Sequence, residues 1–314
     1  MGADEGGAAA RLEAMARHKA LIRRWTAALN AGNVARLRVL AAPDCMVHLS
    51  GKPPLDLAAA ERLAVSFRAA FPDGPLSIDE LLAEGDKVVH RWTVRGTHQR
   101  DFAGIAATGQ RIAVAGIFIY RVAGGKVMEV WASADDLGLL QQLGAVPTPG
   151  QARPEHCHAA GILAGMHRVI DLDGSENKAE RSTIMSIEEN KALVRRSVDE
   201  GWNKPYFAGV DDCYAVDFVH HDPYHAELKG FPAYKALYGE VVAGLPDAHL
   251  MIEDLIAEGD RVVKRYTIRG THRGELLGVP PTGRQVSLTA ITVYRIANGK
   301  IAEGWAAYDL LGLL

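Results

Sequence analysis

The sequence carries one acidic pattern twice: Glu-x-Trp-x-x-x-Asp occurs at 129–135 and again at 303–309. The surrounding apolar residues predict a β-strand, so the glutamate, the tryptophan and the aspartate of each pattern should share one face. A carboxyl group beside a tryptophan at the end of an apolar strand is partly removed from water, which suits general acid/base catalysis. Asp135 and Asp309 are therefore candidate catalytic groups. The alternative is that each caps a strand end or lies on the surface.

Other polar residues occupy matching places in the two halves. His98 and His272 each follow Gly-Thr at a predicted strand end, where a histidine could donate to a developing enolate oxygen or simply bond a loop carbonyl. Further candidates for orienting a substrate carbonyl are His48, His221, Asn30 and Asn203. For the two asparagines, which close predicted helices, a helix C-cap is the alternative.

Two arginines, Arg91 and Arg265, lie in the middle of predicted strands. A buried arginine needs a partner, and Glu129 or Glu303 on a neighbouring strand is the candidate, so a structural ion pair is favoured over an anion-binding role. The aromatic residues expected to line the core or a pocket are Trp92, Tyr266, Trp131, Trp305, Tyr120 and Tyr294.

Metal and phosphate chemistry find no support in the motifs. The run His220-His221-Asp222, with His225 nearby, resembles a metal site, but adjacent residues of a strand point to opposite faces. No glycine-rich phosphate loop, nucleophile elbow or Cys-x-x-Cys motif is present. We expect neither a metal nor a cofactor.

The paired residues belong to an internal duplication. Residues 84–139 align with 258–313 at a constant offset of 174, and 27 of these 56 pairs are identical. Each copy is of domain size, so the sequence predicts tandem domains over 15–143 and 186–314, joined by a linker over 144–185.

The same elements should position the candidates in both copies. Periodicity predicts an amphipathic helix, a short second helix, a short strand, a third helix and an antiparallel meander. The second helices are expected at 34–40 and 207–215, and the third at 57–70 and 231–243. This order predicts an α+β roll, with a pocket between the helices and the concave side of the sheet.

The junction between the copies carries two further signals. Helical spacing over 154–172 predicts a helix in the linker. Ser186 followed by Glu189 predicts a capping box at the start of the second copy.

Composition narrows the classes of function. The 314 residues carry a formal net charge of −3 and are 48% hydrophobic. Without a basic stripe or a long apolar run, we expect neither nucleic-acid binding nor a membrane span. Three cysteines and the absence of a signal-like N-terminus favour a reducing, cytoplasmic setting.

Several motifs recur together in both copies. They are Gly-Thr-His (96–98; 270–272), Thr-Gly (108–109; 282–283), Tyr-Arg (120–121; 294–295), Gly-Lys (125–126; 299–300) and the acidic pattern. In combination they resemble the SnoaL-like polyketide (ester) cyclases, of the nuclear transport factor two and ketosteroid isomerase superfamily. The resemblance implies cone-like α+β barrels that pair through their sheets, and cofactor-free acid/base chemistry with Asp135 and Asp309 as the acid/base. The first copy departs from the pattern at Leu49-Ser50 and Ala106-Ala107.

Two functions remain open. In the first, a carboxylate removes a proton next to the carbonyl of a small ligand, and cyclisation, isomerisation or a lyase-type step follows. In the second, the domains bind an apolar ligand or act as a scaffold without catalysis, and a dry pocket without Asp135 or Asp309 on its wall would favour this reading. The two copies could pair within the chain as a pseudo-dimer or between chains as a homo-oligomer.

Overall fold

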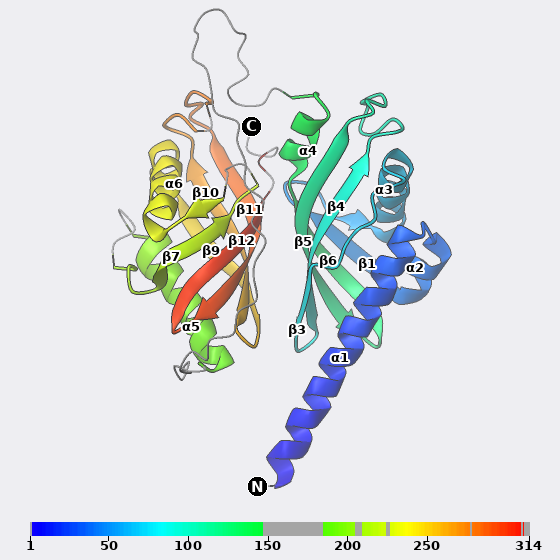
Figure 1. Cartoon of the computed structure of the whole chain (residues 1–314), viewed down its shortest axis with the longest axis horizontal. Coiled ribbons are helices and arrows are strands. Elements are labelled where there is room, and N and C mark those ends of the chain that lie inside the picture. Colours follow the sequence, from blue (N-terminus) through cyan, green and yellow to red (C-terminus); the bar gives the residue numbers. More distant parts are fainter. Residues whose placement is uncertain are drawn as a thin grey trace, which may run out of the picture.

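The structure is a computed structural model that describes residues 2–146, 185–204, 209–223, 227–276, 278–308 and 310, with side chains from Gly7 onward. It confirms two tandem α+β domains, each with a six-stranded sheet that carries helices on one face (Figure 1). No helix in these ranges is both long enough and apolar enough to cross a membrane.

The first domain contains four helices and six strands. They are α1 (Gly2–Asn30), α2 (Val34–Leu40), β1 (Ala41–Leu49), β2 (Leu55–Asp56), α3 (Leu57–Ala70), β3 (Glu80–Glu84), β4 (Lys87–Thr97), β5 (Arg111–Ala123), β6 (Lys126–Ala134) and α4 (Asp136–Gln142).

The second domain repeats most of this order within its described residues. Its elements are α5 (Ile187–Ser197), the π-helical turn η1 (Val198–Trp202), β7 (Tyr214–His221), β8 (Leu228–Lys229), α6 (Phe231–Gly244), β9 (His249–Glu258), β10 (Arg261–Thr271), β11 (Gln285–Ala297) and β12 (Lys300–Tyr308).

The strand orders are β2-β1-β6-β5-β4-β3 and β8-β7-β12-β11-β10-β9. The predicted meander accounts for β3 to β6 and for β9 to β12, with antiparallel pairs throughout. The first strand of each domain instead pairs parallel with the last one. This pairing brings the end of β1 beside the end of β6, and the end of β7 beside the end of β12.

Three expectations about helices have different outcomes. The capping box is confirmed, because Ser186 accepts from the backbone of Glu189 and the Glu189 carboxylate accepts in return. The helix over 207–215 is wrong in its described part: residues 209–213 form turns, and Tyr214 begins β7 because it pairs with Ile301 of β12. The linker helix over 154–172 lies outside the described residues.

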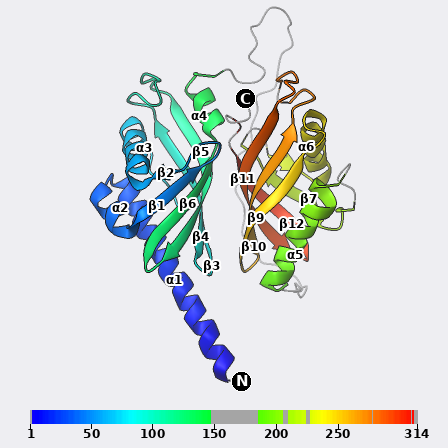
Figure 2. The ribbon, with the colours of Figure 1, turned by 180° about the vertical axis from the view of Figure 1, so that it is seen from behind.

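The two sheets pack against each other, with their helices on the outer sides (Figures 1 and 2). A cluster of aliphatic side chains joins them: Leu82, Val89, Ile117, Ile119, Ile256, Val263, Ile291, Val293 and Ala307, flanked by Trp131 and Trp305. Burying this surface removes one face of each sheet from water and stabilises the intrachain pair.

Matched polar contacts surround this interface. Glu84 pairs with Lys191 of the other domain and accepts from the backbone N–H of Ala257 at 2.9 Å. Glu258, its counterpart, pairs with Lys19 at 2.6 Å and accepts from the N–H of Ala83 at 2.7 Å. Each glutamate thus reaches across to the opposite sheet. The inner face of each sheet is turned toward the helices of its own domain.

Candidate functional site

The first domain encloses a cavity of about 470 Å³ between its helices and the inner face of its sheet. Its wall is largely apolar, and includes Leu29, Val47, Leu49, Phe67, Val114 and Phe118. Trp92 and Tyr120 also line it. Their polar atoms, Nε1 and the hydroxyl oxygen, are buried without a hydrogen-bond partner among the described residues. A largely apolar wall of this kind suits an apolar ligand.

Asp135 does not line this cavity. It shares the strand face of Trp131, which lies in the aliphatic cluster between the domains, whereas its neighbour Asp136 lines the cavity. The Asp135 carboxylate caps α4, accepting from the backbone N–H of Gly138 at 2.7 Å, and the residue is 8% exposed. A Cβ at Gly138 would lie only 2.0 Å from that carboxylate, so glycine makes the cap possible. Asp135 is therefore the N-cap of the helix that follows its strand, whereas the alternative reading of the sequence was a strand-end cap or a surface charge.

Two substitutions separate a cap from a catalytic base at Asp135. Because asparagine caps helices about as well as aspartate, Asp135→Asn should leave stability nearly unchanged, whereas Asp135→Ala should cost about 0.5–2 kcal/mol. Urea unfolding of both variants measures this difference. If Asp135→Asn instead lost the ability to remove a proton next to a carbonyl group while its stability was unchanged, the carboxylate would be identified as a base.

The predicted histidines and asparagines form the same bonds in both domains. His98 is buried and its Nδ1 lies 3.1 Å from the hydroxyl of Thr108, as His272 does from Thr282. Asn30 lines the cavity, and its side-chain amide makes two hydrogen bonds to the backbone of Leu76, at 2.8 and 2.9 Å. The counterparts Asn203 and Leu250 repeat this pair at 2.9 and 3.0 Å. These bonds tie helix ends and loops to the sheet, and no substrate role is needed to explain them.

His48 and His221 lie on the outer sheet face, away from the cavity. His48 stacks on Trp131 and its Nε2 lies 2.9 Å from Glu129. His221 does the same with Trp305 and Glu303. Although burial opposes it, hydrogen bonds from Arg121 and His48 lower the pKa of Glu129. These glutamates are thus held as anions in a structural cluster.

The expected partners of Arg91 and Arg265 are wrong. Arg91 pairs with Glu80 at 3.4 Å, and Arg265 with Asp254 at 2.6 Å, within the same hairpin. Each guanidinium also lies 4.9 Å from the centre of a tryptophan ring of the other domain: Trp305 for Arg91 and Trp131 for Arg265. Both arginines therefore belong to the interface between the domains, where cation–π contacts add to the ion pairs.

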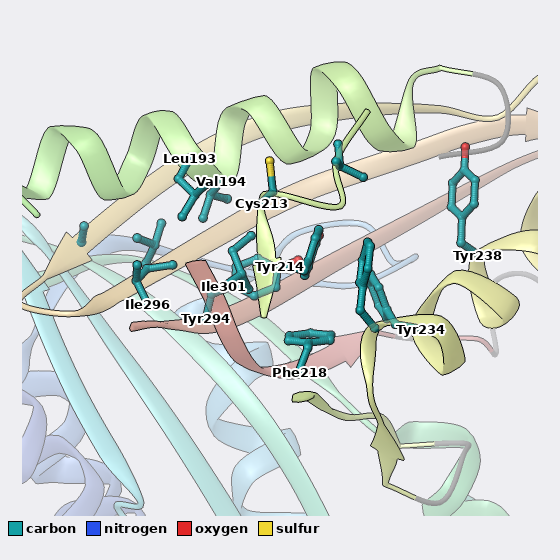
Figure 3. Packing of buried hydrophobic residues seen from close by; sticks show 14 residues of the cluster. Leu193, Val194, Cys213, Tyr214, Phe218, Tyr234, Tyr238, Tyr294, Ile296 and Ile301 are labelled. Atoms are coloured by element: carbon teal, nitrogen blue, oxygen red, sulfur yellow. The ribbon is translucent and has the colours of Figure 1, made fainter. Parts of the chain in front are cut away.

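The interior of the second domain is polar where the first is apolar. The sequence offset matches six residues that line the cavity of the first domain with larger or more polar counterparts. These replacements are Val47 by His220, Leu49 by Asp222, Ala60 by Tyr234, Ala64 by Tyr238, Phe118 by Thr292 and Ala134 by Tyr308. Figure 3 shows Tyr234 and Tyr238 extending from α6, and Tyr214 and Tyr294 from the strands.

A carboxylate, a phenol and an imidazole meet where β7 and β12 end. Tyr308 donates a hydrogen bond to Asp222, and His220 Nε2 lies 3.8 Å from the same carboxylate. The Asp222 side chain has no exposed surface. Gly304 makes room for this arrangement, because a Cβ there would lie 3.3 Å from His220 Nδ1 and 3.2 Å from the ring of Tyr294. A water-poor carboxylate beside two proton-carrying groups is suited to acid/base chemistry.

Lys264 is the second unusual group of this interior. It is 1% exposed, and its Nζ lies 4.3 Å from the centre of the Tyr266 ring and 5.4 Å from that of Tyr294. Among the described residues, Nζ has neither a hydrogen bond nor a carboxylate partner. Burial lowers the pKa of Lys264 from 10.5 to about 7. In the first domain its place is taken by His90, whose Nε2 bonds the carbonyl of Ser77 at 2.8 Å.

This burial predicts a pH-dependent stability. Between about pH 7 and 10.5 the unfolded chain holds a proton on Lys264 that the folded chain has lost, so the lysine destabilises the fold most at and below pH 7. We expect Lys264→Met to raise the free energy of unfolding at pH 7, with the gain shrinking by roughly 1.4 kcal/mol per pH unit above it. Denaturant unfolding at pH 7 and 9.5 measures the change. The exposed Lys229→Met is the control, and an equal gain at both pH values would contradict the assignment.

Asp222 was considered only as part of a metal-like run in the sequence, and neither Tyr308 nor Lys264 was singled out there as a candidate. Aligning the two copies could have drawn attention to Asp222 and Tyr308. Each replaces an apolar residue of the first copy at a position that faces the interior of the domain. The opposite orientation of His220 and His221 was anticipated and is confirmed, since His220 is buried inside the domain and His221 contacts Glu303 outside. Asp309 and His225 lie outside the described residues.

Comparison with known proteins agrees with this duplicated architecture. The family model described as SnoaL-like polyketide cyclase matches residues 19–143 and 192–314. The chain is 33% identical over 131 residues to the aklanonic acid methyl ester cyclase DnrD of Streptomyces peucetius, covering 38% of this chain and 84% of that protein. It is 32% identical over 128 residues to the aklanonic acid methyl ester cyclase DauD of Streptomyces sp. (strain C5), covering 38% and 76%.

Solved structures of similar proteins include AclR from Streptomyces galilaeus, titled a putative hydroxylase, at 32% identity, 41% and 95% coverage and a TM-score of 0.38. IdmH from Streptomyces antibioticus, titled a putative polyketide cyclase, matches at 30% identity, 40% and 98% coverage and a TM-score of 0.38. Since the family model covers most of the chain in two matches, the chain belongs to the SnoaL-like polyketide cyclase family and contains its domain twice.

Proposed function

We propose that the protein is an enzyme that moves protons next to the carbonyl group of a polyketide-like ester, with the chemistry in the second domain. The family supports a small-molecule enzyme of the cyclase or isomerase type. The observation that carries the finer proposal is the buried Asp222 carboxylate, hydrogen-bonded by Tyr308 and close to His220. The first domain has leucine, alanine and valine at these three places.

The proposed reaction assigns one task to each group. Asp222 accepts the proton of the carbon next to the carbonyl, and Tyr308 or His220 donates to the enolate oxygen that forms. The enolate carbon then attacks a second carbonyl in ring closure, or is reprotonated elsewhere in isomerisation. Asp309, the acid/base position implied by the family motif, directly follows Tyr308 and stays part of the proposal. These steps need no cofactor.

Proton exchange tests this function without knowledge of the natural substrate. The chain is incubated in D₂O with a panel of β-keto esters and, separately, with aklanonic acid methyl ester, and loss of the acidic C–H signal is followed by NMR. We expect the folded chain to exchange at least one ester faster than buffer and than heat-denatured chain. Equal rates in all three samples, across the whole panel, would contradict the proposal.

The cavity of the first domain favours a second function there: holding an apolar ligand without reacting with it. Its wall is largely apolar, and Asp135 caps α4 instead of lining it. The duplicated chain would then divide binding and chemistry between its two interiors.

A further inference from the structure

Lys264 has no task in the acid/base steps proposed above, and its surroundings do not explain it as a structural residue. A buried ammonium normally has a carboxylate partner or several hydrogen-bond acceptors. Among the described residues Lys264 has neither, and two tyrosine rings lie against its Nζ instead. A residue this costly to bury is more often kept for chemistry than for stability.

We propose that Lys264 is a covalent site, whose amine condenses with the carbonyl group of a ligand in the second domain to form a Schiff base. The inference shares with the proposed function only the assumption that a carbonyl compound enters this interior. It names a reactive group separate from the carboxylate, and it predicts a bond that can be trapped and located.

The position of Lys264 supports this assignment. On β10 it alternates with Val262 and Tyr266, which are buried on the inner face, whereas Val263 and Arg265 face the other domain. The lysine therefore points into the same interior as the Asp222 cluster. Titratable groups facing this interior from the neighbouring elements are Tyr214 and His220 (β7), Asp222 (directly after β7), Tyr234 and Tyr238 (α6), Tyr266 (β10), Tyr294 (β11) and Tyr308 (β12).

The electrostatic setting favours the neutral amine. Burial raises the pKa values of Tyr266 and Tyr294, so both phenols keep their protons near neutral pH and offer no anion to hold an ammonium. Burial also lowers the pKa of Lys264 to about 7. An ordinary lysine is neutral in only about one molecule in a thousand at pH 7.5. A neutral amine in an apolar pocket is the nucleophile that Schiff-base chemistry requires.

The atoms of the step balance without an oxidant or a reductant. The Nζ lone pair attacks the carbonyl carbon, a C–N bond forms, and the carbonyl oxygen takes up a proton. The C–O bond then breaks, and the oxygen leaves as water with both protons that the amine has lost. The product is a neutral imine. When its nitrogen takes up one further proton from the solvent, the protonated Schiff base withdraws electrons more strongly than a ketone, so it would acidify the neighbouring C–H bond, the bond that the proposed function breaks.

The first domain supplies an internal comparison. His90 occupies the place of Lys264, is fully buried, and is bonded through Nε2 to the carbonyl of Ser77. An imidazole cannot form a stable imine, so the covalent site should exist in the second domain alone.

The test uses acetylacetone, a 1,3-diketone that converts a neutral lysine into a stable enaminone with near-ultraviolet absorbance. The full chain is labelled at pH 7.5, and intact mass and peptide mapping locate the adduct. We expect one adduct, equal in mass to the diketone minus one water, on the peptide that contains Lys264. Its rate of formation should rise with pH and level off above about 7, whereas exposed lysines should keep gaining reactivity toward pH 10.5.

Variants make the result decisive. Lys264→Met and Lys264→Arg should lose the adduct, and Lys229→Met, at an exposed lysine, should keep it. Absence of the adduct from folded wild-type chain, or labelling spread evenly over exposed lysines, would overturn the inference. Proton exchange without an adduct would reject the covalent site alone. An adduct without exchange would reject the acid/base function alone.

Discussion

Replacing Asp222 by asparagine is expected to slow proton exchange at the β-keto ester by about 100-fold or more, the effect of removing a positioned general base. Asparagine keeps the size and can still accept the hydrogen bond from Tyr308, but it cannot take up the proton. NMR exchange rates at saturating ester measure the effect. Because Asp222 is buried, the unfolding midpoint of the variant must be recorded beside its rate.

A matched control lies on the strand that Asp222 follows. Asp217 is an exposed aspartate of β7, so Asp217→Asn makes the same chemical change outside the domain interior. It should leave the exchange rate unchanged. An Asp222→Asn variant that folds normally and exchanges at the wild-type rate would remove this carboxylate from the mechanism and leave Asp309 as the base to test.

Filling the cavity of the first domain should abolish its binding of apolar ligands while sparing the exchange reaction. Ala64→Tyr introduces into α3 the ring that the second domain carries as Tyr238. We expect the affinity for an apolar fluorescent probe to fall by about tenfold or more, equivalent to about 1.4 kcal/mol. Fluorescence titration measures the affinity, and the NMR assay measures exchange.

The control for this prediction is Ala69→Tyr, which places the same ring on the exposed side of α3, away from the cavity wall. It should leave both measurements unchanged. If Ala64→Tyr leaves probe binding intact, the ligand binds elsewhere. If it abolishes exchange together with binding, the chemistry belongs to the first domain.

The duplication and most strands could be predicted from the sequence, because identical turn and strand motifs recur at a constant offset. Alternation also predicted which residues share a face, as in the case of Trp131 and Asp135. It did not predict which face is the interior, because both faces of these strands are apolar. On β5, Ile117 and Ile119 pack between the domains, whereas Phe118 and Tyr120 line the cavity.

This ambiguity explains the misplaced site residues. In a sequence, the pattern of a tryptophan near an acidic residue is the same whether the residues line a pocket or lie at an interface between domains. The arginines were assigned to the wrong glutamates for a related reason. Pairing within the hairpin brings Arg91 opposite Glu80, whereas Glu129 is already bonded to Arg121 and His48. Alternation in one domain does not tell which residues of the other domain its apolar face contacts.

The most direct test of a division of labour between the two interiors is a crystal structure of the chain with a β-keto ester that carries two methyl groups between its carbonyls. Such an ester cannot lose the proton in question and should remain bound unreacted. We expect its keto oxygen to lie within hydrogen-bond distance of Tyr308 or His220 in the second domain. An ester bound in the first domain alone, out of contact with Asp222 and Lys264, would contradict the proposal that the second domain carries the chemistry.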